Sequence, residues 1–114
     1  MTEAVLTRSA ARTAGVTPFV ELIEIRLHFG DVQDLKGKRK LVKSLKDSIR
    51  QRFGASVAEI DGHDKWQRST LLCAMVGDGE VSDRADGLVR FVESRCPDGC
   101  SVERDLLSLR DIRD

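Results

Sequence analysis

Positively charged side chains are concentrated in one short segment of a chain whose formal net charge is zero. Residues 35–53 include eight Lys or Arg residues and a single acidic residue, Asp47. On a helical plot with about 100° per residue, six of these cations lie within a sector of roughly 120°. We call these six the basic stripe: Lys36, Arg39, Lys40, Lys43, Lys46 and Arg50. Such a row of cations is suited to contact the phosphate backbone of RNA.

The stability of a helix does not explain the basic stripe. Cations in the first turn lie at the positive end of the helix dipole, which repels each of them by about 0.3–1 kcal/mol at low salt. Like charges also lie on adjacent turns, as in the pairs Lys36/Lys40 and Arg39/Lys43. Because an external polyanion would relieve this repulsion, the pattern favours a non-catalytic RNA- or ribosome-binding protein over a merely solvated face. The alternative is that the same face docks an acidic protein partner.

A second cluster of polar residues follows the stripe in the sequence and could do acid–base or metal chemistry. It consists of Glu59, Asp61, His63 and Asp64. On an extended strand, alternation places Glu59 and Asp61 on one face with position 63, whereas Asp64 is not constrained. No hydrolase signature accompanies these residues. We therefore expect no cofactor and no metal, and a small enzyme that uses this acidic hairpin is the less favoured alternative.

The sequence contains three cysteines. Cys73 lies in an apolar run and is expected to be a small buried hydrophobic residue. The C-x3-C spacing of Cys96 and Cys100 could form a local disulfide or half of a zinc site, but no second Cys or His pair completes such a site. We interpret both residues as incidental loop thiols in a reducing cytosol.

Few side chains in this sequence could stack on nucleic-acid bases. Trp66 is the only Trp, and residues 69–76, the expected third strand, include no aromatic residue. Stacking of bases on the sheet is therefore disfavoured, and we interpret Trp66 as a packing lid over the edge of the hairpin. Lys38 and Arg52 fall near the apolar side of the helical plot, where we expect their long side chains to extend along the helix to water.

The spacing of apolar residues predicts the elements that position these side chains. Period-2 alternation indicates strands, and rows at i, i+4 and i+7 indicate helices. The helix over 35–53 is preceded by Asp34 as an N-cap and followed by Gly54 as a stop signal. The other expected elements are strands over 23–29, 55–61, 69–76 and 100–109, a loop over 62–68, and a helix from Val81 to Val92. This βαββαβ order is typical of the ferredoxin-like fold, an α+β sandwich in which two helices cover one face of a four-stranded antiparallel sheet.

The predicted core joins both helices to one face of the sheet. The helical residues that we expect to pack there are Leu41, Val42, Leu45, Ile49 and Phe53 of the first helix and Leu88, Val89 and Val92 of the second. In this topology the first and third strands are central, and the third strand is apolar on both faces. A homodimer that packs sheet to sheet would cover the open face, and a mildly apolar face without a partner is the alternative.

The length of 114 residues fits one domain. We expect a flexible extension over 1–18, the ferredoxin-like domain over 19–109 and a C-terminal tail over 110–114. No apolar run is long enough to span a membrane, and the first residues lack the apolar core of a secretory signal. We therefore expect a cytoplasmic protein with no membrane partner.

Three motifs in a fixed order carry a resemblance to a known family. They are LKxKR over 35–39, FGASVAEI over 53–60 and DxWQ over 64–67. With them, the segment from about 19 to 107 resembles the bacterial YlxP-like family, a domain of unknown function. The resemblance implies a ferredoxin-like fold and a gene that often accompanies translation and ribosome-maturation factors, which makes RNA or the ribosome the implied partner. Asp34 replaces the usual Ser of the family and Gly54 the usual Asn, and both substitutes suit their capping positions.

Overall fold

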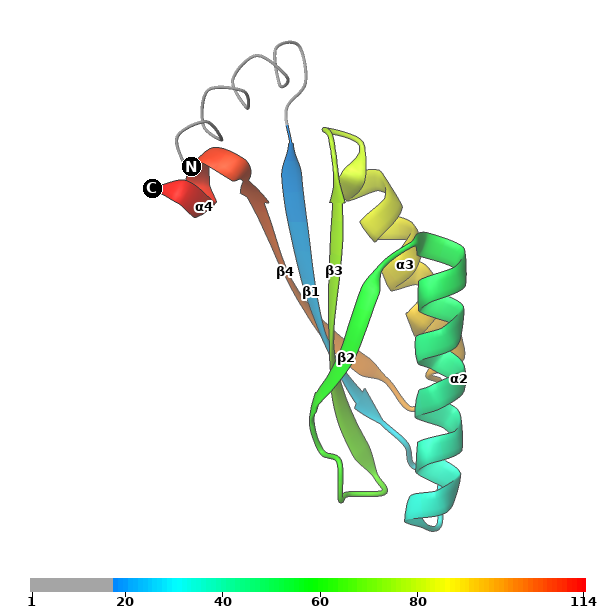
Figure 1. Cartoon of the computed structure of the whole chain (residues 1–114). Helices are drawn as coiled ribbons and strands as arrows, with labels where there is room; N and C mark the ends of the chain where they lie inside the picture. The colour runs from blue at the N-terminus through cyan, green and yellow to red at the C-terminus, as the bar shows by residue number, and fades with distance from the viewer. Residues whose placement is uncertain (1–17) are drawn as a thin grey trace.

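The computed structural model of the chain describes residues 18–114 (Figure 1). Its elements are β1 (Phe19–His28), α2 (Leu35–Phe53), β2 (Ser56–Asp61), β3 (Arg68–Gly77), α3 (Val81–Arg95), β4 (Cys100–Ser108) and α4 (Leu109–Arg113). The first six have the predicted βαββαβ order, and β1 begins four residues before the predicted strand. The five-residue helix α4 occupies most of the expected C-terminal tail. The expected extension over 1–18 lies, except for Pro18, outside the described residues.

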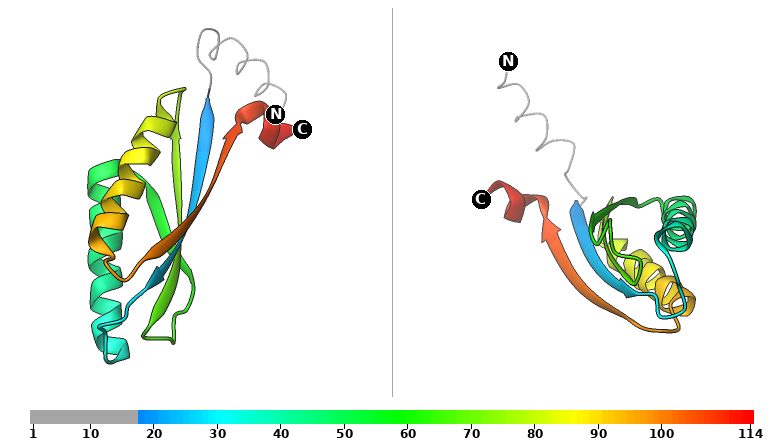
Figure 2. Two further views of the ribbon diagram at one scale, coloured as in Figure 1. Left: turned by 180° about the vertical axis from the view of Figure 1, so that it is seen from behind. Right: turned by 90° about the horizontal axis from the view of Figure 1, so that it is seen from below.

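The strands form one antiparallel sheet in the order β2-β3-β1-β4, so β1 and β3 are central as predicted. Figure 2 shows α2 and α3 side by side on the same face of this sheet. This arrangement confirms the ferredoxin-like α+β fold. No helix within residues 18–114 is both long and apolar enough to cross a bilayer.

Both ends of α2 are fixed by the residues that the sequence indicated. The side chain of Asp34 accepts a hydrogen bond of 2.7 Å from the amide of Gly37, which satisfies one of the free donors of the first turn. At the other end Gly54 adopts a left-handed conformation with φ of 62°, and its amide donates to the carbonyl of Arg50. A residue without a Cβ adopts this conformation at no steric cost. The caps therefore define where the basic stripe begins and ends.

The core lies between the sheet and the two helices. Val42, Leu45 and Ile49 of α2 are buried there with Leu88 and Val92 of α3. The strands contribute the alternate residues Ile23, Ile25 and Leu27 of β1, Val57 of β2 and Leu71, Cys73 and Met75 of β3. Most of the predicted core face is thus confirmed.

Two predicted core residues of α2 are less buried than expected. Leu41 is 48% exposed, so its assignment to the core is wrong. It precedes the buried Val42 by one residue, which turns it by about 100° around the helix axis and away from the sheet. It lines a surface hollow with Phe29 and Val32 instead. Phe53 is half-buried and packs against Phe91, with 5.7 Å between the ring centroids.

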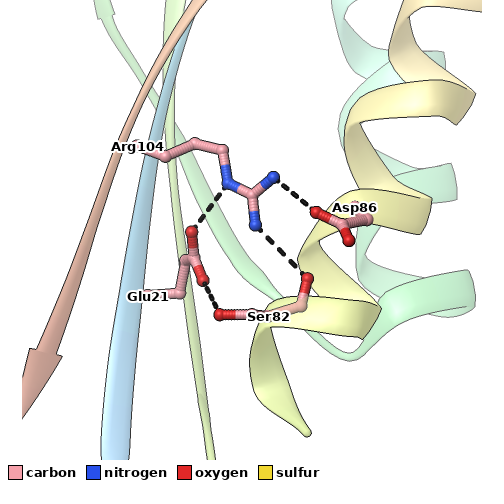
Figure 3. Close-up of polar contacts among 4 residues, drawn as sticks. All are labelled: Glu21, Ser82, Asp86 and Arg104. Atoms are coloured by element: carbon pink, nitrogen blue, oxygen red, sulfur yellow. Dashed lines mark hydrogen bonds and ion pairs between the residues drawn. The ribbon is translucent and has the colours of Figure 1, made fainter.

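A buried carboxylate connects the sheet to the start of α3 (Figure 3). Glu21 of β1 is almost fully buried, and it accepts hydrogen bonds of 2.7 Å from Nε of Arg104 and 3.0 Å from the hydroxyl of Ser82. Arg104 also donates to Asp86 over 2.6 Å. One arginine of β4 therefore joins β1 to the first turns of α3, as a buried charge requires partners of opposite sign. The sequence analysis missed Glu21 because the predicted first strand began after it.

The opposite face of the sheet is open in the described part of the chain. On β3, Leu72 and Ala74 face outward and are half-buried, and Val76 is 68% exposed. Val76 lies opposite Val20 of β1, and Ala74 lies opposite Leu22. The expectation that the third strand is apolar on both faces is therefore confirmed.

The three cysteines are free. Cys73 is buried as expected, and burial raises the pKa of its thiol to about 12. Cys96 is not a loop thiol, because it caps the C-terminus of α3 and packs in the core, where burial raises its pKa to about 11. Cys100 is the first residue of β4 and is half-buried.

Candidate nucleic-acid interface

All six residues of the basic stripe lie on α2, outside the side of the helix that is buried in the core. Five are exposed, and Lys46 is half-buried. The buried residues Val42, Leu45 and Ile49 hold another side of the helix on the core. At the end of the stripe, Nη2 of Arg50 donates to the carbonyl of Val57 in β2 over 3.1 Å. Because the apolar side of α2 packs on the core, the basic stripe remains accessible at the protein surface.

Only two of the six cations form ion pairs with described residues, and they share one carboxylate. The Nζ of Lys43 lies 2.9 Å from Asp47, and Nη1 of Arg50 lies 3.5 Å from it. The hydrogen bond from Lys43 and the charges of both partners lower the pKa of Asp47. Within residues 18–114 the other four cations have no ion-pair partner: Lys36, Arg39, Lys40 and Lys46. The stripe therefore keeps most of its positive charge.

The stripe borders a hollow of about 240 Å³ beside β2. Arg39, Lys43 and Lys46 line it from α2, and Glu59 and His63 line it from the β2 side. The structure thus brings the stripe together with two members of the acidic hairpin. Asp61 and Asp64 are exposed and do not line this hollow.

Lys38 does not extend to water as expected. Its side chain is fully buried, and Nζ donates to Oε2 of Glu59 at 2.5 Å and to the carbonyl of Gly62 at 2.6 Å. The hydroxyl of Ser69 donates to the same carboxylate at 2.5 Å. Acceptors within the protein satisfy the ammonium group, so it has no need to reach solvent. Arg52 is exposed as expected, and its guanidinium lies 4.7 Å from the centre of the Phe91 ring.

The carboxylate of Glu59 has a structural role, because donors inside the protein bind it. Burial alone would raise its pKa, but hydrogen bonds from Lys38 and Ser69 and the charge of Lys38 outweigh burial and hold the pKa below the usual range. Glu59 is therefore an ionised acceptor for internal donors. A general base would need a free carboxylate that faces a substrate, and the carboxylate of Glu59 is already bonded to Lys38 and Ser69.

A break in strand register separates the acidic residues that alternation placed together. Glu59 lies opposite Leu71, but Asp61 lies opposite Thr70, because Ile60 is an extra residue in the ladder. Such a bulge turns the following residues to the other face. Glu59 thus faces the helices and Asp61 the open side, and the predicted shared face is wrong. The described residues contain no group of three His, Cys, Asp or Glu side chains that could hold a metal ion.

Trp66 is not a packing lid. Its side chain is 45% exposed in the loop between β2 and β3. It lines a hollow with its neighbours in sequence, which are Asp64, Lys65 and Gln67 of the loop and Arg68, the first residue of β3. The loop end is fixed, since the amide of Phe29 donates to the carbonyl of Gln67 at 2.7 Å. A fixed loop therefore presents an exposed indole.

The sequence analysis missed the pairing of Lys38 with Glu59, although a signal for it was present. Lys38 belongs to the LKxKR motif, and Glu59 belongs to the SVAE part of the second motif. A lysine on the apolar side of an amphipathic helix indicates a buried partner as readily as an extended side chain. A carboxylate in a strand beside that helix was the candidate for this buried partner of Lys38.

The fold and these motifs agree with a match to one family. The model of the family described as "Protein of unknown function (DUF503)" matches residues 20–102. The chain belongs to this family. The matched segment of this DUF503 member includes the whole basic stripe, the Lys38–Glu59 pair and the loop that carries Trp66.

Other comparisons concern the fold of this DUF503 member. Among curated proteins none matches the chain. It is similar to a solved structure titled "De novo designed protein Foldit4", with a TM-score of 0.50 and 15% sequence identity. The similarity covers 78% of this chain and 94% of the designed one. At this identity the similarity supports the fold alone.

Proposed function

We propose that this protein binds structured RNA through contacts between the basic stripe and the phosphate backbone, without catalysis. The observation that carries the proposal is the row of exposed cations on α2, four of which have no ion-pair partner among residues 18–114. From Lys36 to Arg50 the row extends for about 21 Å at 1.5 Å per residue. This length spans several phosphates of an RNA strand.

The distribution of aromatic residues supports backbone contacts instead of base stacking on the sheet. Among the outward residues of the central strands only His28, at the end of β1, has a ring. The middle of the open face, with Val20, Leu22 and Leu72, has none. RNA-recognition motifs stack bases on aromatic side chains at these positions. The affinity would therefore come from charge on the helix.

The resemblance to the YlxP-like family supports ribosomal RNA as the source of the phosphates and the cytoplasm as the location. The association of that family's genes with translation and ribosome-maturation factors favours a ribosomal particle over other polyanions. An acidic protein partner is the competing proposal, because a carboxylate surface would also neutralise the stripe.

Reversal of two charges in the stripe tests this proposal. Arg39→Glu with Lys43→Glu should abolish binding to ribosomal RNA. The melting temperature should stay level or rise, because the new carboxylates lie one turn from Lys36, Lys40 and Lys46, which outweighs the loss of the exposed Lys43–Asp47 pair. In the parent, log K should fall linearly with log salt, and each lost contact should make the slope shallower by nearly one unit.

A matched control makes the same change of charge elsewhere. Arg110→Glu with Arg113→Glu alters two exposed cations of α4, which lies away from α2 (Figure 1). This control should bind RNA nearly as the parent does. Retention of full binding by the Arg39/Lys43 variant would show that the stripe is only a solvated face. If the Arg39/Lys43 variant loses binding to an acidic protein but keeps its binding to RNA, the result would support the competing proposal of an acidic protein partner.

We also propose that two copies pack through the open sheet face. Val76 is the most exposed large apolar residue of that face, and Val20, Leu22 and Ala74 continue the apolar surface around it. At the other end of the face Arg26 is held by Glu24 and Glu103, so those charges need no partner from outside. A second copy of the same surface would bury both apolar regions at once.

A further inference from the structure

The loop between β2 and β3 is held against the helix that carries the basic stripe. Lys38 of α2 donates to the carbonyl of Gly62, the first residue after β2. Gly62 has a φ of 83°, and a Cβ there would lie 2.8 Å from the carbonyl oxygen of Arg68, so the position requires glycine. At its far end the loop is bound to the residue that follows β1, because the amide of Phe29 donates to the carbonyl of Gln67. The loop therefore has a fixed position beside the stripe.

The loop region beside α2 carries an aromatic ring, the cations Lys65 and Arg68, and the exposed carboxylates of Asp61 and Asp64. His63 lines the same hollow as Arg39, Lys43 and Lys46. Trp66 follows His63 by three residues, so their Cα atoms are at most about 11 Å apart. Lys65 and Arg68 are exposed on either side of Trp66. Neither has an ion-pair partner among the described residues.

We propose that Trp66 is a stacking site for an unpaired base of an RNA strand whose phosphates continue onto the basic stripe. An indole that is 45% exposed keeps part of its ring surface free for a ligand. Stacking on an aromatic ring beside cations is how proteins bind single-stranded nucleic acid. This site rests on the proposed function, and it specifies a single-stranded segment next to the structured RNA that the stripe binds.

The position of Trp66 makes the site directly measurable. It is the only Trp in the chain, and the chain has no Tyr. Tryptophan fluorescence therefore reports on this loop alone. A labelled oligouridine of about 12 nucleotides should quench the fluorescence of the parent, whereas a blunt RNA duplex should bind with little quenching.

Substitution of the ring separates stacking from phosphate binding. Trp66→Ala should weaken oligouridine binding by about 5- to 150-fold, the effect of losing one stacked base. Trp66→Phe keeps a ring and should restore most of the affinity. Both variants should bind the blunt duplex like the parent and melt at the parent temperature, since the side chain is not part of the core.

The outcomes separate this inference from the proposed function. If Trp66→Ala binds oligouridine as tightly as the parent does, the stacking site is wrong, and the exposed indole would suit a protein partner instead. The proposed function would still stand if the Arg39/Lys43 charge reversal abolishes duplex binding. If the parent binds neither RNA, both proposals are wrong.

Discussion

The ammonium group of Lys38 and the carboxylate of Glu59 form a buried ion pair that joins the first turns of α2 to β2. The two residues are 21 positions apart in the sequence. Their contact places the basic stripe beside the hairpin, because Lys38 lies on the same helix as the stripe and also holds Gly62. The interface that we propose for RNA therefore depends on a pair that need not touch RNA.

Removal of Lys38 should destabilise the protein markedly. Lys38→Met would leave Glu59 as a largely buried carboxylate without its cation, and breaking such a pair costs about 3–5 kcal/mol. Because Ser69 remains a donor and Glu59 is 15% exposed, we expect the lower end of this range. Urea unfolding would measure the change. Lys36→Met, on the exposed side of the same turn, should change stability by less than about 0.5 kcal/mol, and equal losses in both variants would contradict the role of the pair.

Stability should depend on pH through Glu59. Burial opposes ionisation, but the donors Lys38 and Ser69 hold its folded pKa below the ordinary value of 4.5. The unfolded chain thus takes up this proton at a higher pH than the folded protein. The contribution of Glu59 is therefore complete above about pH 5 and is lost as the pH falls through the folded pKa.

Glu59→Gln tests this dependence. The variant should be less stable than the parent at neutral pH, because a buried ammonium has lost its counter-charge. The difference in unfolding free energy between parent and variant should narrow as urea unfolding is repeated from about pH 6 towards pH 2. The reason is that the parent alone loses the contribution of this carboxylate. A gap of constant size over this range would show that Glu59 is not the titrating group.

The packing of α2 is tested by two identical truncations on one helix. Leu45→Ala should lower the free energy of unfolding by about 2–5 kcal/mol, because this side chain is buried in the core. Leu41→Ala should cost less than about 1 kcal/mol, since nearly half of that side chain is already in water. Denaturant unfolding measures both. The reverse order would mean that the buried face of α2 has been assigned incorrectly.

The proposed homodimer predicts the sedimentation behaviour of the chain. At high protein concentration sedimentation equilibrium should give about twice the monomer mass of 12.7 kDa. Val76→Lys should shift the equilibrium to monomer, because a charge would be buried in the apolar contact. Ser101→Lys on the charged end of the same face is the matched control and should leave the mass unchanged. A parent that remains monomeric would rule out this assembly.

The sequence by itself determined the elements and the basic stripe, because both depend on local spacing. Alternation identified the first strand and a short apolar run the third, the helical rows identified α2 and α3, and Asp34 and Gly54 marked the ends of α2. Each signal involves residues within a few positions of one another, where backbone geometry alone fixes which side chains share a face. The order of these elements was then sufficient to predict the topology.

The tertiary structure alone decided which polar residues are buried and which apolar residues are exposed. Lys38 and Glu21 are buried because Glu59 and Arg104, distant in sequence, satisfy their charges. The extra residue Ile60 in β2 moved Asp61 to the other face, which a strict period of two cannot anticipate. Trp66 remained 45% exposed and lines a hollow formed by residues 64–68. These outcomes depend on which surfaces meet after the chain has folded, and residue spacing does not contain that information.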